Sequence, residues 1–576
     1  MKIELKDAFK GYTRDQDKVV APEETVKRLK EKLAAMELEI LDQTVRIDNG
    51  RLDIPVFFSY CGRDAVELTG TKKQMGKGAT PQQAEASAVM ELAERYSFFS
   101  FAKNPQNFFT EQYRHIKDRA LPFQLISKSV HDASEDLDAA RKIFESVPLQ
   151  WTTAYNLTGQ HEVLIPFDWF YAINEFNGPS AGNCVEEALS QGICEIVERH
   201  ASSLISHNRM KTPAINPDSA TQPLVVEMLQ KYKNAGIKLF VTDFTLDMGI
   251  PSVGVLAYDP STFPGKSEIV WTAGTTPDPQ KSFSRALTET AQLAGDFNSG
   301  TNYVASGLPK FTGLKEAAFV TDPTETIDIS ALPDISNDNI RIEVENCISA
   351  LADRDLQVIA IDTLHPLLKI PAFYTIIPGA HFRERARGIG VSMFAAKLIA
   401  EKQPPPDAIS ELKKIEKLLP GKYYVSFFRG TCHLALNDPE TALKHFTMAS
   451  ERQPTREDIA AIYSYMGICH KDMADYRRAL AVLKEGEKYD NERTDIYNLM
   501  GFCHFMLKEH EQAIACFNRV IALDPSSAID YANIASNYRD MGRLEDAVRY
   551  YVMALELDPT ITFARENLER LQSAGS

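Results

Sequence analysis

The sequence is poor in cysteine, and its few cysteines are not grouped. It has 8 cysteines among 576 residues, and no two of them form a CxxC pair. Disulfide-stapled domains are dense in cysteine, whereas zinc ribbons and thioredoxin-type sites need closely spaced pairs. The sequence therefore argues against all three classes.

An excess of positive charge is also lacking. The 63 lysines and arginines are outnumbered by 79 aspartates and glutamates, which gives a formal net charge of -16. A field of this sign repels phosphate backbones, so we expect no nucleic-acid partner.

Long apolar runs are missing as well. No run approaches the roughly 20 residues that a membrane span requires. The N-terminal stretch MKIELKDAFKGYTRDQDK alternates charged and apolar residues and has no signal-peptide pattern. We therefore predict a cytoplasmic protein with no membrane partner.

The composition is otherwise that of a folded globular protein, with 44% hydrophobic and 25% charged residues. A chain of 576 residues exceeds what one core usually organises, so several domains are expected. The run EKQPPPDAIS places three prolines in a row, which predicts an extended connector. We predict a first domain over residues 1–403, a proline-rich linker over 404–407 and a second domain over 408–576.

The second domain shows an internal repeat. Alanines recur at positions 442, 479, 513 and 547, so the intervals are 37, 34 and 34 residues, and 34 is the tetratricopeptide period. Small residues recur ahead of them, and aromatic residues follow at the positions that pack the two helices of a unit together: Gly430, Gly467, Gly501 and Ala535, then Phe446, Phe517 and Tyr551. Prolines at 454, 525 and 559 end three units. We predict about four repeats, which form an all-α solenoid.

Three Cys-His pairs fall within these repeats, at Cys432-His433, Cys469-His470 and Cys503-His504. Sulfur and imidazole are zinc ligands, so a metal cluster is one interpretation. Each pair begins two residues after the glycine of its unit. Equivalent positions on stacked repeats lie about a helix diameter apart. That distance is too long for bonds of roughly 2.0 to 2.3 Å to one zinc ion. We interpret the pairs as repeat positions.

The first domain alternates strand-like and helix-like segments, which predicts an α+β fold. Strand-like runs include LDIPVFFSYC, EVLIPFDWFYAI, KLFVTDFT, PSVGVLAYD, QVIAIDTL and AFYTIIPG. Two longer stretches, AGIKLFVTDFTLDMGIPSVGVLAYD and RDLQVIAIDTLHPLLKIPAFYTIIPG, share the order strand, Asp with Thr, Ile-Pro, strand. We infer an internal duplication.

Two predicted helices share the pattern Glu-x-x-Glu-Arg. On the first, Ser87, Glu91 and Glu94 lie on one face because their spacing is i, i+4, i+7; on the second, the same holds for Glu187, Gln191, Glu195 and Glu198. Either copy alone is usually a solvated helix face with local ion pairs. Two copies are harder to explain in this way, because each follows a glycine-bearing loop, MGKGATPQQAEAS and NGPSAGN, of a kind that lets a backbone approach an anion.

Clustered carboxylates repel one another unless cations lie between them. Mg²⁺ prefers hard oxygen ligands and completes its shell with water and substrate phosphates, so Mg-ATP is the expected guest. Arg95 and Arg199 stand beside the two acidic pairs and can contact a phosphate or orient a carboxylate.

Together these motifs resemble the YcaO family. The resemblance lies in Gly76-Lys77-Gly78 followed by Ser87, Glu91, Glu94 and Arg95, in Asn177 to Asn183 followed by the second acidic helix, and in Arg285 and Glu289 of SFSRALTETAQ. It spans nearly all of residues 10 to 400. Lys18 and Thr25 in DKVVAPEETVKR are similar to the family's N-terminal nucleotide-contacting segment.

The resemblance implies a YcaO-type fold that binds ATP and Mg²⁺. It implies Glu91, Glu94, Glu195 and Glu198 as magnesium ligands, and these four with Arg199 as the catalytic residues. It implies an ATP-binding set of Lys18, Thr25, Lys77, Ser87, Ser180, Asn183, Glu187, Gln191, Arg285 and Glu289. The family reaction phosphorylates the oxyanion formed when a nucleophile adds to a peptide-backbone amide, and it yields an azoline or a thioamide.

The last third of the chain departs from many azoline-forming members, which end in a proline-rich tail. Here the chain continues into repeats, and this layout resembles the bacterial YcaO branch named as an accessory to ribosomal-protein methylthiolation. We expect the repeats to recruit a protein or peptide substrate, or to pack on their own enzyme domain or a second copy. Because no cysteine stands in a recognisably activated setting, we expect a separate protein to donate sulfur if a thioamide is formed. A homodimer is a further implication of the resemblance.

Three other interpretations were weighed. GPSAG at 178–182 satisfies G-x-S-x-G, with Ser180 as nucleophile, but no apolar strand precedes it. GTKKQMGKG has five residues between Gly70 and Gly76 where a P-loop has four. The main alternative is an ATP-sensing, non-enzymatic scaffold or adaptor. The sequence leaves open the substrate and the choice among thioamide, azoline and accessory chemistry.

Overall fold

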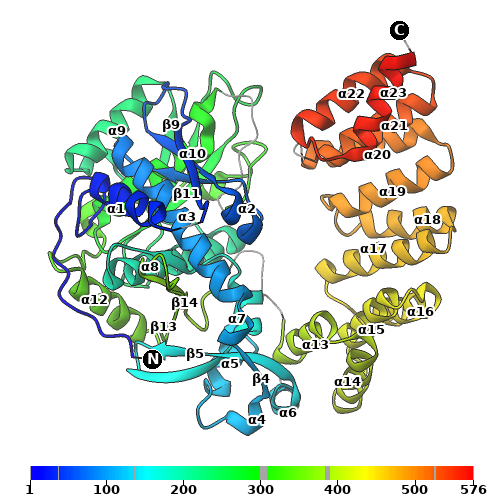
Figure 1. The fold of residues 1–576 in the computed structure, drawn as a ribbon, viewed down its shortest axis with the longest axis horizontal. Helices are drawn as coiled ribbons and strands as arrows, with labels where there is room; N and C mark the ends of the chain where they lie inside the picture. The colour runs from blue at the N-terminus through cyan, green and yellow to red at the C-terminus, as the bar shows by residue number, and fades with distance from the viewer. Residues whose placement is uncertain are drawn as a thin grey trace. The chain divides into compact units, whose positions relative to one another are not determined.

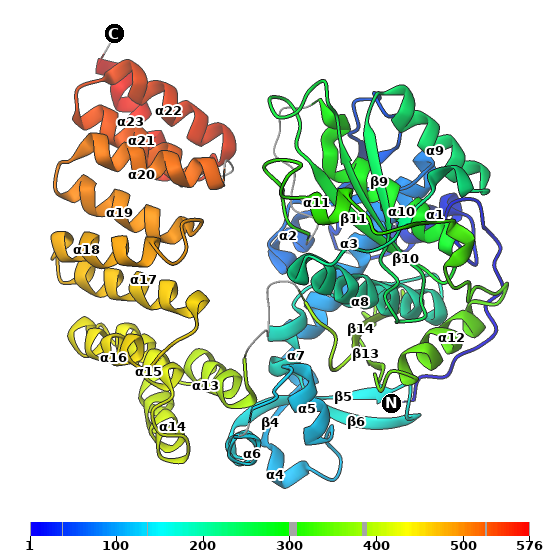
Figure 2. The same cartoon turned by 180° about the vertical axis from the view of Figure 1, so that it is seen from behind.

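The computed structural model describes residues 2–36, 38–134, 136–298, 308–382, 389–524 and 527–574. It divides into two compact units, one of residues 1–133 and 145–390 and the other of residues 134–144 and 391–576 (Figures 1 and 2). The predicted α+β domain followed by an all-α solenoid is confirmed. The predicted limits at 403 and 408 stay a prediction.

Three sheets form the frame of the first unit. The first sheet has the order β1-β2-β3: Leu41–Arg46, Val56–Cys61 and Lys73–Lys77. The second has the order β11-β10-β9-β8-β12: Val270–Thr275, Ser252–Tyr258, Lys238–Asp243, Ala214–Ile215 and Thr326–Ile327. The third has the order β4-β5-β13-β14-β7, with β6 paired to β5: Phe109–Gln112, Pro148–Asn156, Ile359–Asp362, Ala372–Ile376, Pro179–Ala181 and His161–Pro166. Only β8 and β12 pair in parallel among these described strands.

Three long helices lie among the sheets, as Figures 1 and 2 show. Helix α3, Pro81–Lys103, packs on β2 and β3; α8, Val185–Asn208, packs on β14 and β7; α10, Pro279–Ala294, packs on β11 and β10. The remaining α-helices of this unit are α1 Pro22–Ala34, α2 Arg63–Thr69, α4 Tyr113–Ile116, α5 Phe123–Ser129, α7 Phe167–Asn174, α9 Pro223–Asn234, α11 Ala318–Thr321 and α12 Ile340–Ala352. Helix α6, Leu137–Ser146, spans one of the limits between the units.

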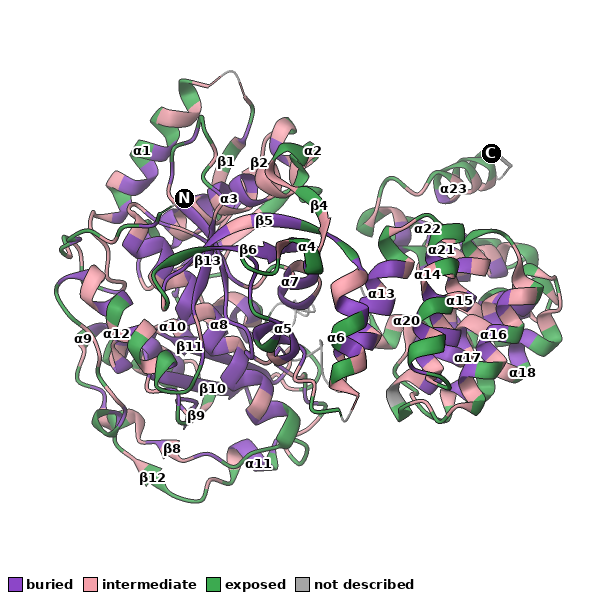
Figure 3. Ribbon diagram, turned by 90° about the horizontal axis from the view of Figure 1, so that it is seen from below, coloured by how far each residue is buried: buried purple, intermediate pink, exposed green. Residues whose placement is uncertain are grey.

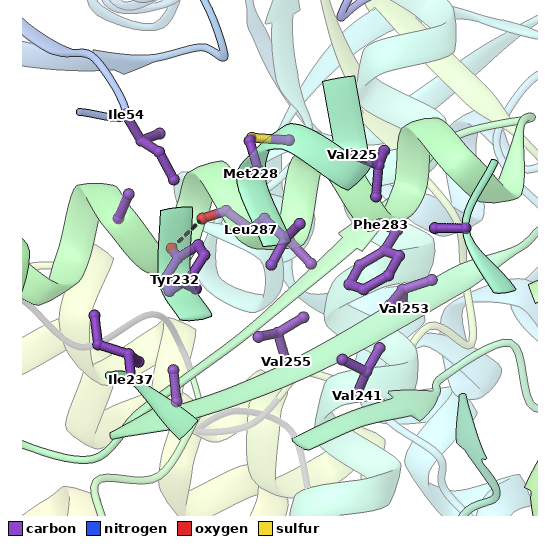
Figure 4. Close-up of a cluster of buried hydrophobic side chains, with 14 of the residues drawn as sticks. Ile54, Val225, Met228, Tyr232, Ile237, Val241, Val253, Val255, Phe283 and Leu287 are labelled. Atoms are coloured by element: carbon purple, nitrogen blue, oxygen red, sulfur yellow. Dashed lines mark hydrogen bonds between the residues drawn. The ribbon is translucent and has the colours of Figure 1, made fainter. Parts of the chain in front are cut away.

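A buried apolar cluster fixes α10 on its sheet. Figure 4 shows side chains of α9 and α10 facing Val241, Val253 and Val255 of the strands. The hydroxyl of Tyr232 on α9 donates to the carbonyl oxygen of Leu287 on α10 at 2.7 Å, so the buried phenol is satisfied. The buried apolar side chains and this hydrogen bond together fix α10 on its sheet, and the charged residues of α10 are thereby held in a defined position.

One predicted strand is partly a helix. The run EVLIPFDWFYAI begins as β6 but continues as α7 from Phe167 onwards. A short apolar run is compatible with a buried strand or a buried helix, so periodicity alone did not separate them. The two stretches proposed as a duplication both form antiparallel pairs, β9 with β10 and β13 with β14, and the duplication itself stays a prediction.

The glycines of the loop MGKGATPQQAEAS have a packing role. A Cβ on Gly76 would stand 2.0 Å from the backbone nitrogen of Ala88, and one on Gly78 would stand 2.6 Å from that of Ala84. The close approach that these glycines permit is therefore between β3 and α3. It brings Lys77, at the end of β3, against the helix that carries Glu91 and Glu94.

The second unit is helical. Its helices after α6 are α13 Val391–Lys402, α14 Pro405–Leu418, α15 Tyr423–Ala435, α16 Pro439–Glu451, α17 Arg456–Asp472, α18 Tyr476–Glu487, α19 Thr494–Met506, α20 His510–Leu523, α21 Ala528–Asp540, α22 Leu544–Leu557 and α23 Thr562–Ala574. The proline run begins α14, and only Pro404 is extended, so the predicted connector is wrong for residues 405–407. Proline suits the first helical turn because its missing N–H has no partner there.

Small and aromatic residues interlock in three repeats, as the sequence predicted, whereas Gly467 of the second repeat packs against Leu483. The position of a Cβ on Gly430 lies 2.7 Å from the ring of Phe446, and the same distance separates Gly501 from Phe517. Tyr551 packs with Ala535 in the last unit. Figure 3 shows the buried residues of these helices alternating with exposed ones. Pro525, predicted to end a repeat, lies outside the described residues.

Within the described ranges, no helix is long and apolar enough to cross a membrane.

Replacing Gly76 by alanine should lower the free energy of unfolding by about 1–3 kcal/mol, the usual range for overpacking, because the new methyl group overlaps the α3 backbone. Urea denaturation followed by circular dichroism measures the change. Gly313→Ala is the matched control, because nothing lies within 4 Å of its Cβ position. Equal stability of the two variants would contradict the packing role.

Candidate active site

The first acidic helix, α3, is fixed at its start. Thr80 is the N-cap and its side chain accepts a hydrogen bond from the backbone N–H of Gln83, while Pro81 occupies the first helical position. Glu91, Glu94 and Arg95 follow on one side of the helix. The Glu91 side chain is 34% exposed, and that of Glu94 is 16% exposed. Both carboxylates therefore lie in a recess that solvent still reaches.

The second acidic helix, α8, presents a row of polar side chains one turn apart: Glu187, Gln191, Glu195 and Glu198. From the first to the last of them the helix rises by about 16 Å, at 1.5 Å per residue. Glu198 is the most buried, with 2% of its side chain exposed. A row of this length matches an extended ligand that lies along the helix.

Arginines approach all four glutamates without closing on them. Arg95 lies 3.9 Å from Glu91 and 3.6 Å from Glu94, and Arg199 lies 3.9 Å from Glu195 and 3.4 Å from Glu198. Charge-assisted hydrogen bonds are shorter, about 2.7–2.9 Å. The arginines thus offset part of the negative charge of the four carboxylates.

The two acidic helices influence each other electrostatically. Burial raises the pKa of Glu91, and Glu195 on the other helix adds to this effect. The pKa of Glu94 is raised well above its usual value, again mainly by burial, with further contributions from Glu195 and Glu91. Burial alone lowers the pKa of Arg95, but Glu94, Glu91 and Glu195 outweigh it and raise the pKa. The glutamates of α3 and α8 therefore belong to one charge cluster.

Helix α10 and strand β3 complete this cluster. Arg285 lies 3.4 Å from Glu198, and its guanidinium donates to Gln191 Oε1 at 3.0 Å. Lys77 contacts the carboxylate of Glu289. Burial and the charge of Arg285 lower the pKa of Lys77 to about 7, whereas Glu198 and Glu91 favour its charged form. Four cationic and five anionic side chains are thus gathered from three helices and one strand: Lys77, Arg95, Arg199 and Arg285, and Glu91, Glu94, Glu195, Glu198 and Glu289.

A pocket adjoins the start of α8. Its volume is about 40 Å³, and its lining includes Lys18, Glu187 and Gln191. Glu187 accepts hydrogen bonds from the backbone N–H of Val19 at 2.6 Å and from both the backbone and the side chain of Asn183 at 2.9 Å. Lys18 therefore lies next to a residue that is bonded to α8.

Thr25 belongs to the same group. Its hydroxyl donates to Asn183 Oδ1 at 3.0 Å, so α1 is tied to the loop before α8. The structure thus brings Lys18, Thr25, Asn183, Glu187 and Gln191 together at the pocket. Arg285 links them to the charge cluster through Gln191.

Two predicted residues lie apart from these contacts. Ser87 is half-buried one turn ahead of Glu91 on α3. Ser180 is fully buried on β7, and its Oγ lies 2.8 Å from the position of a Cβ on Gly192 of α8. It faces the packed side of α8, where a substrate does not reach a nucleophilic serine, and this counts against the esterase interpretation of GPSAG.

Sequence reasoning missed other pocket residues. Asp17, Thr275, Thr276, Lys281 and Glu343 also line the pocket. Lys281 stands four residues before Arg285 on α10, which is a signal that could have been used. Glu343, in the ordinary helical stretch IRIEVENC of α12, carries no such signal.

The donor set fits magnesium and a phosphorylated ligand. Hard carboxylate oxygens are held near one another, and arginine and lysine side chains stand beside them. In the part of the chain that the structure describes, no group of three or more His, Cys, Asp and Glu side chains is placed to hold one metal ion. A divalent ion here needs water and phosphate oxygens as further ligands, which is how Mg²⁺ is usually held.

Comparison with known proteins identifies the family of the first unit. The sequence model of a family described as YcaO cyclodehydratase, ATP- and Mg²⁺-binding, matches residues 75–381, more than half of the chain. Models of the tetratricopeptide repeat match residues 494–527 and 531–561.

Relatives match part of the chain. An uncharacterized protein of Methanothermobacter thermautotrophicus is 28% identical over 380 residues, which cover 62% of this chain and 94% of that protein. The ribosomal protein S12 methylthiotransferase accessory factor YcaO of Escherichia coli is 26% identical over 241 residues, which cover 38% of this chain and 40% of that protein.

Solved structures share the fold. A heterocyclase in complex with substrate and cofactor has a TM-score of 0.54 and 22% identity, covering 66% of this chain and 55% of its own. YcaO from Methanopyrus kandleri bound with AMPPCP and Mg²⁺ has a TM-score of 0.50 and 20% identity, covering 65% of this chain and 95% of its own. The chain therefore belongs to the YcaO family, with ATP and Mg²⁺ as its cofactors and with tetratricopeptide repeats behind its YcaO domain.

Proposed function

We propose that this protein uses Mg-ATP to activate a backbone amide of a protein or peptide substrate. The gathering of Glu91, Glu94, Glu195 and Glu198 beside arginines that do not close on them supports this function most directly. Phosphoryl transfer depends mainly on positioning and on neutralisation of charge, and the cluster supplies both. When a nucleophile has added to the amide, phosphorylation of the amide oxygen turns that oxygen into a leaving group. Bound Mg-ATP supplies this phosphoryl group.

The residues divide into two sets of roles. The four glutamates hold Mg²⁺, and Arg199, Arg285 and Lys77 face the phosphates, because cations and carboxylates alternate there. At the other end of the α8 row, Lys18, Thr25, Asn183, Glu187 and Gln191 bind the rest of the nucleotide. Ser87 and Glu289 belong to the phosphate side by their places on α3 and α10, and Ser180 acts through the packing of β7 on α8.

The nucleophile comes from the substrate or from a second protein. The thiols of this unit are buried or half-buried. Burial raises the pKa of Cys61, and it raises the pKa of Cys184 to about 12. A raised thiol pKa lowers the fraction of thiolate, and the thiolate is the reactive form. Intramolecular attack by a substrate side chain gives an azoline, and sulfide from a donor protein gives a thioamide.

The repeats supply a protein-binding surface, because stacked helix pairs of this kind serve protein recognition. They recruit the substrate or the sulfur donor to the YcaO domain. The name of the Escherichia coli relative supports a related role, as an accessory to ribosomal-protein methylthiolation. A homodimer is the expected assembly of the family.

Replacing Glu91 or Glu195 by glutamine should lower ATP-dependent phosphate release by about 100-fold or more, the scale seen when one transition-state charge contact is lost. Steady-state phosphate assays on the full chain measure this. Glu227→Gln, an exposed change on α9, is the control and should retain the normal rate. Equal rates in all four proteins would favour the alternative, a non-enzymatic ATP-sensing scaffold.

Replacing Glu94 by glutamine should raise the melting temperature of the nucleotide-free protein at neutral pH. Burial raises the pKa of Glu94 in the folded state above its ordinary value of 4.5. At a pH between these two values, Glu94 is protonated in the folded state and ionised in the unfolded state. The free energy of unfolding therefore falls as pH rises through this window, and the neutral amide removes that loss.

Thermal melts of wild type and Glu94→Gln from pH 4.5 upward, with Glu227→Gln as control, measure this difference. The variant should gain most at the highest pH. A lower melting temperature of Glu94→Gln at neutral pH would contradict a destabilising charge at this position.

A partner protein co-purified with the full chain should change mass when it is incubated with Mg-ATP. Loss of one water indicates an azoline, and exchange of oxygen for sulfur in the presence of sulfide indicates a thioamide. Intact and peptide mass spectrometry detect both changes. The Glu91→Gln protein should leave the partner unmodified, and an unmodified partner with wild type as well would count against amide activation.

A further inference from the structure

The N-terminal residues 10–18 form a closed loop beside the pocket. Hydrogen bonds join its two ends. The backbone N–H groups of Gly11 and Tyr12 donate to the carbonyl oxygen of Lys18 at 2.9 Å, and the N–H of Lys18 donates to the carbonyl oxygen of Tyr12 at 2.9 Å. A Cβ on Gly11 would stand 2.4 Å from the carbonyl oxygen of Val19, so glycine is needed at this neck. Gln16, Asp17 and Lys18 of the loop line the pocket.

Four charged side chains hold this loop in place. Lys10 Nζ lies 2.7 Å from Glu343 Oε1 of α12 and 3.0 Å from Asp17 Oδ2. Lys281 Nζ of α10 lies 3.5 Å from Asp17 Oδ1 and contacts the carbonyl oxygen of Thr13. The two cations and two anions alternate, so each charge has opposite neighbours.

The network is buried, which makes it sensitive to the loss of any one member. The side chain of Lys10 is 8% exposed and that of Glu343 is 3% exposed. Burial lowers the pKa of Lys10, but the hydrogen bond to Glu343 and the charge of Asp17 outweigh this effect and raise it. Removing one partner of such a pair leaves the other charge buried without compensation, which is costly.

A further bond pins the loop on its other side. Asp15 is buried and accepts a hydrogen bond from the backbone N–H of Ala79, in the turn between β3 and α3, at 3.2 Å. The loop is thus attached to α10, α12 and the β3–α3 turn, and each of these attachments is remote in sequence. Arg14 at the tip is exposed.

The position of Lys18 follows from these contacts. The residue before it, Asp17, belongs to the charge network, and the backbone N–H of the residue after it, Val19, donates to Glu187 of α8 at 2.6 Å. Lys18 is therefore held between a fixed charge network and the acidic helix.

We propose that the network of Lys10, Asp17, Lys281 and Glu343 closes the N-terminal loop over the pocket and thereby positions Lys18 and its neighbours for nucleotide binding. This inference rests on the proposed function of the pocket. The four side chains are positioning residues: they act through the loop, and the chemistry takes place at the far end of α8.

Glu343→Gln in the full chain tests the inference. The amide removes one charge and keeps nearly the same shape, so the loop loses its attachment to α12 while the rest of α12 is retained. The matched control is Glu345→Gln on the same helix, because Glu345 pairs with the half-buried Arg341 at the surface. We expect the KM for Mg-ATP to rise about tenfold or more in Glu343→Gln, the effect of losing a charged hydrogen bond, with kcat nearly unchanged, and no change in Glu345→Gln.

A second readout does not depend on turnover. Trypsin cleaves after Arg14, and this cleavage should be faster in Glu343→Gln than in wild type or Glu345→Gln, because the loop opens more often. Saturating Mg-ATP should slow the cleavage in wild type. Lys10→Met should resemble Glu343→Gln, and Lys10→Arg should retain most of the affinity because it keeps the charge.

The outcomes separate the two proposals. The proposed function of the pocket is overturned if calorimetry detects no binding of Mg-ATP to wild type and Mg-ATP gives no protection from trypsin. The loop inference alone is overturned if wild type binds Mg-ATP but Glu343→Gln has an unchanged KM. It is also overturned if Glu343→Gln loses only kcat. If Glu343→Gln fails to fold, Asp17→Asn carries the same comparison with the same expected results.

Discussion

Repulsion among carboxylates is the constraint on which the rest of this structure depends. Glu91, Glu94, Glu195 and Glu198 are brought together in a partly buried place, where burial and mutual repulsion raise the pKa values of the two on α3. An arrangement of this kind opposes folding unless the surrounding fold is rigid or a cation is bound. The first unit supplies the rigidity, because three sheets fix the helices that carry these charges.

Each helix is held by a different device. Helix α3 approaches β3 closely because Gly76 and Gly78 have no side chain, α8 packs on β14 and β7 around Gly192, and α10 is anchored by the cluster that includes Tyr232 and Phe283. The result is a row of polar groups along α8 that ends in a charge cluster at one side and in a pocket at the other. In the proposed function, binding and chemistry are thereby separated along one helix.

The N-terminal segment adds a second layer of control over this row. Its backbone satisfies Glu187, and its buried ion pairs join α10 and α12. A buried ion pair contributes little net stability compared with apolar packing, but it specifies one arrangement strongly. A loop held in this way is suited to a site that must admit a charged ligand and then enclose it. The repeats form a separate module with its own core.

The sequence by itself determined the repeats, the α+β class of the first domain and the membership of Glu91, Glu94, Glu195 and Glu198 in two helical faces, because all of these follow from periodicity within a short stretch of chain. It misjudged the run after Pro166 and residues 405–407, where a local pattern fits two conformations. Only the tertiary structure decided that the two acidic faces share one charge cluster, that Ser180 is buried behind α8, and that Lys10, Asp17, Lys281 and Glu343 meet. These residues are up to 333 positions apart, and the approach of such distant segments is set by packing between elements, which no local pattern records.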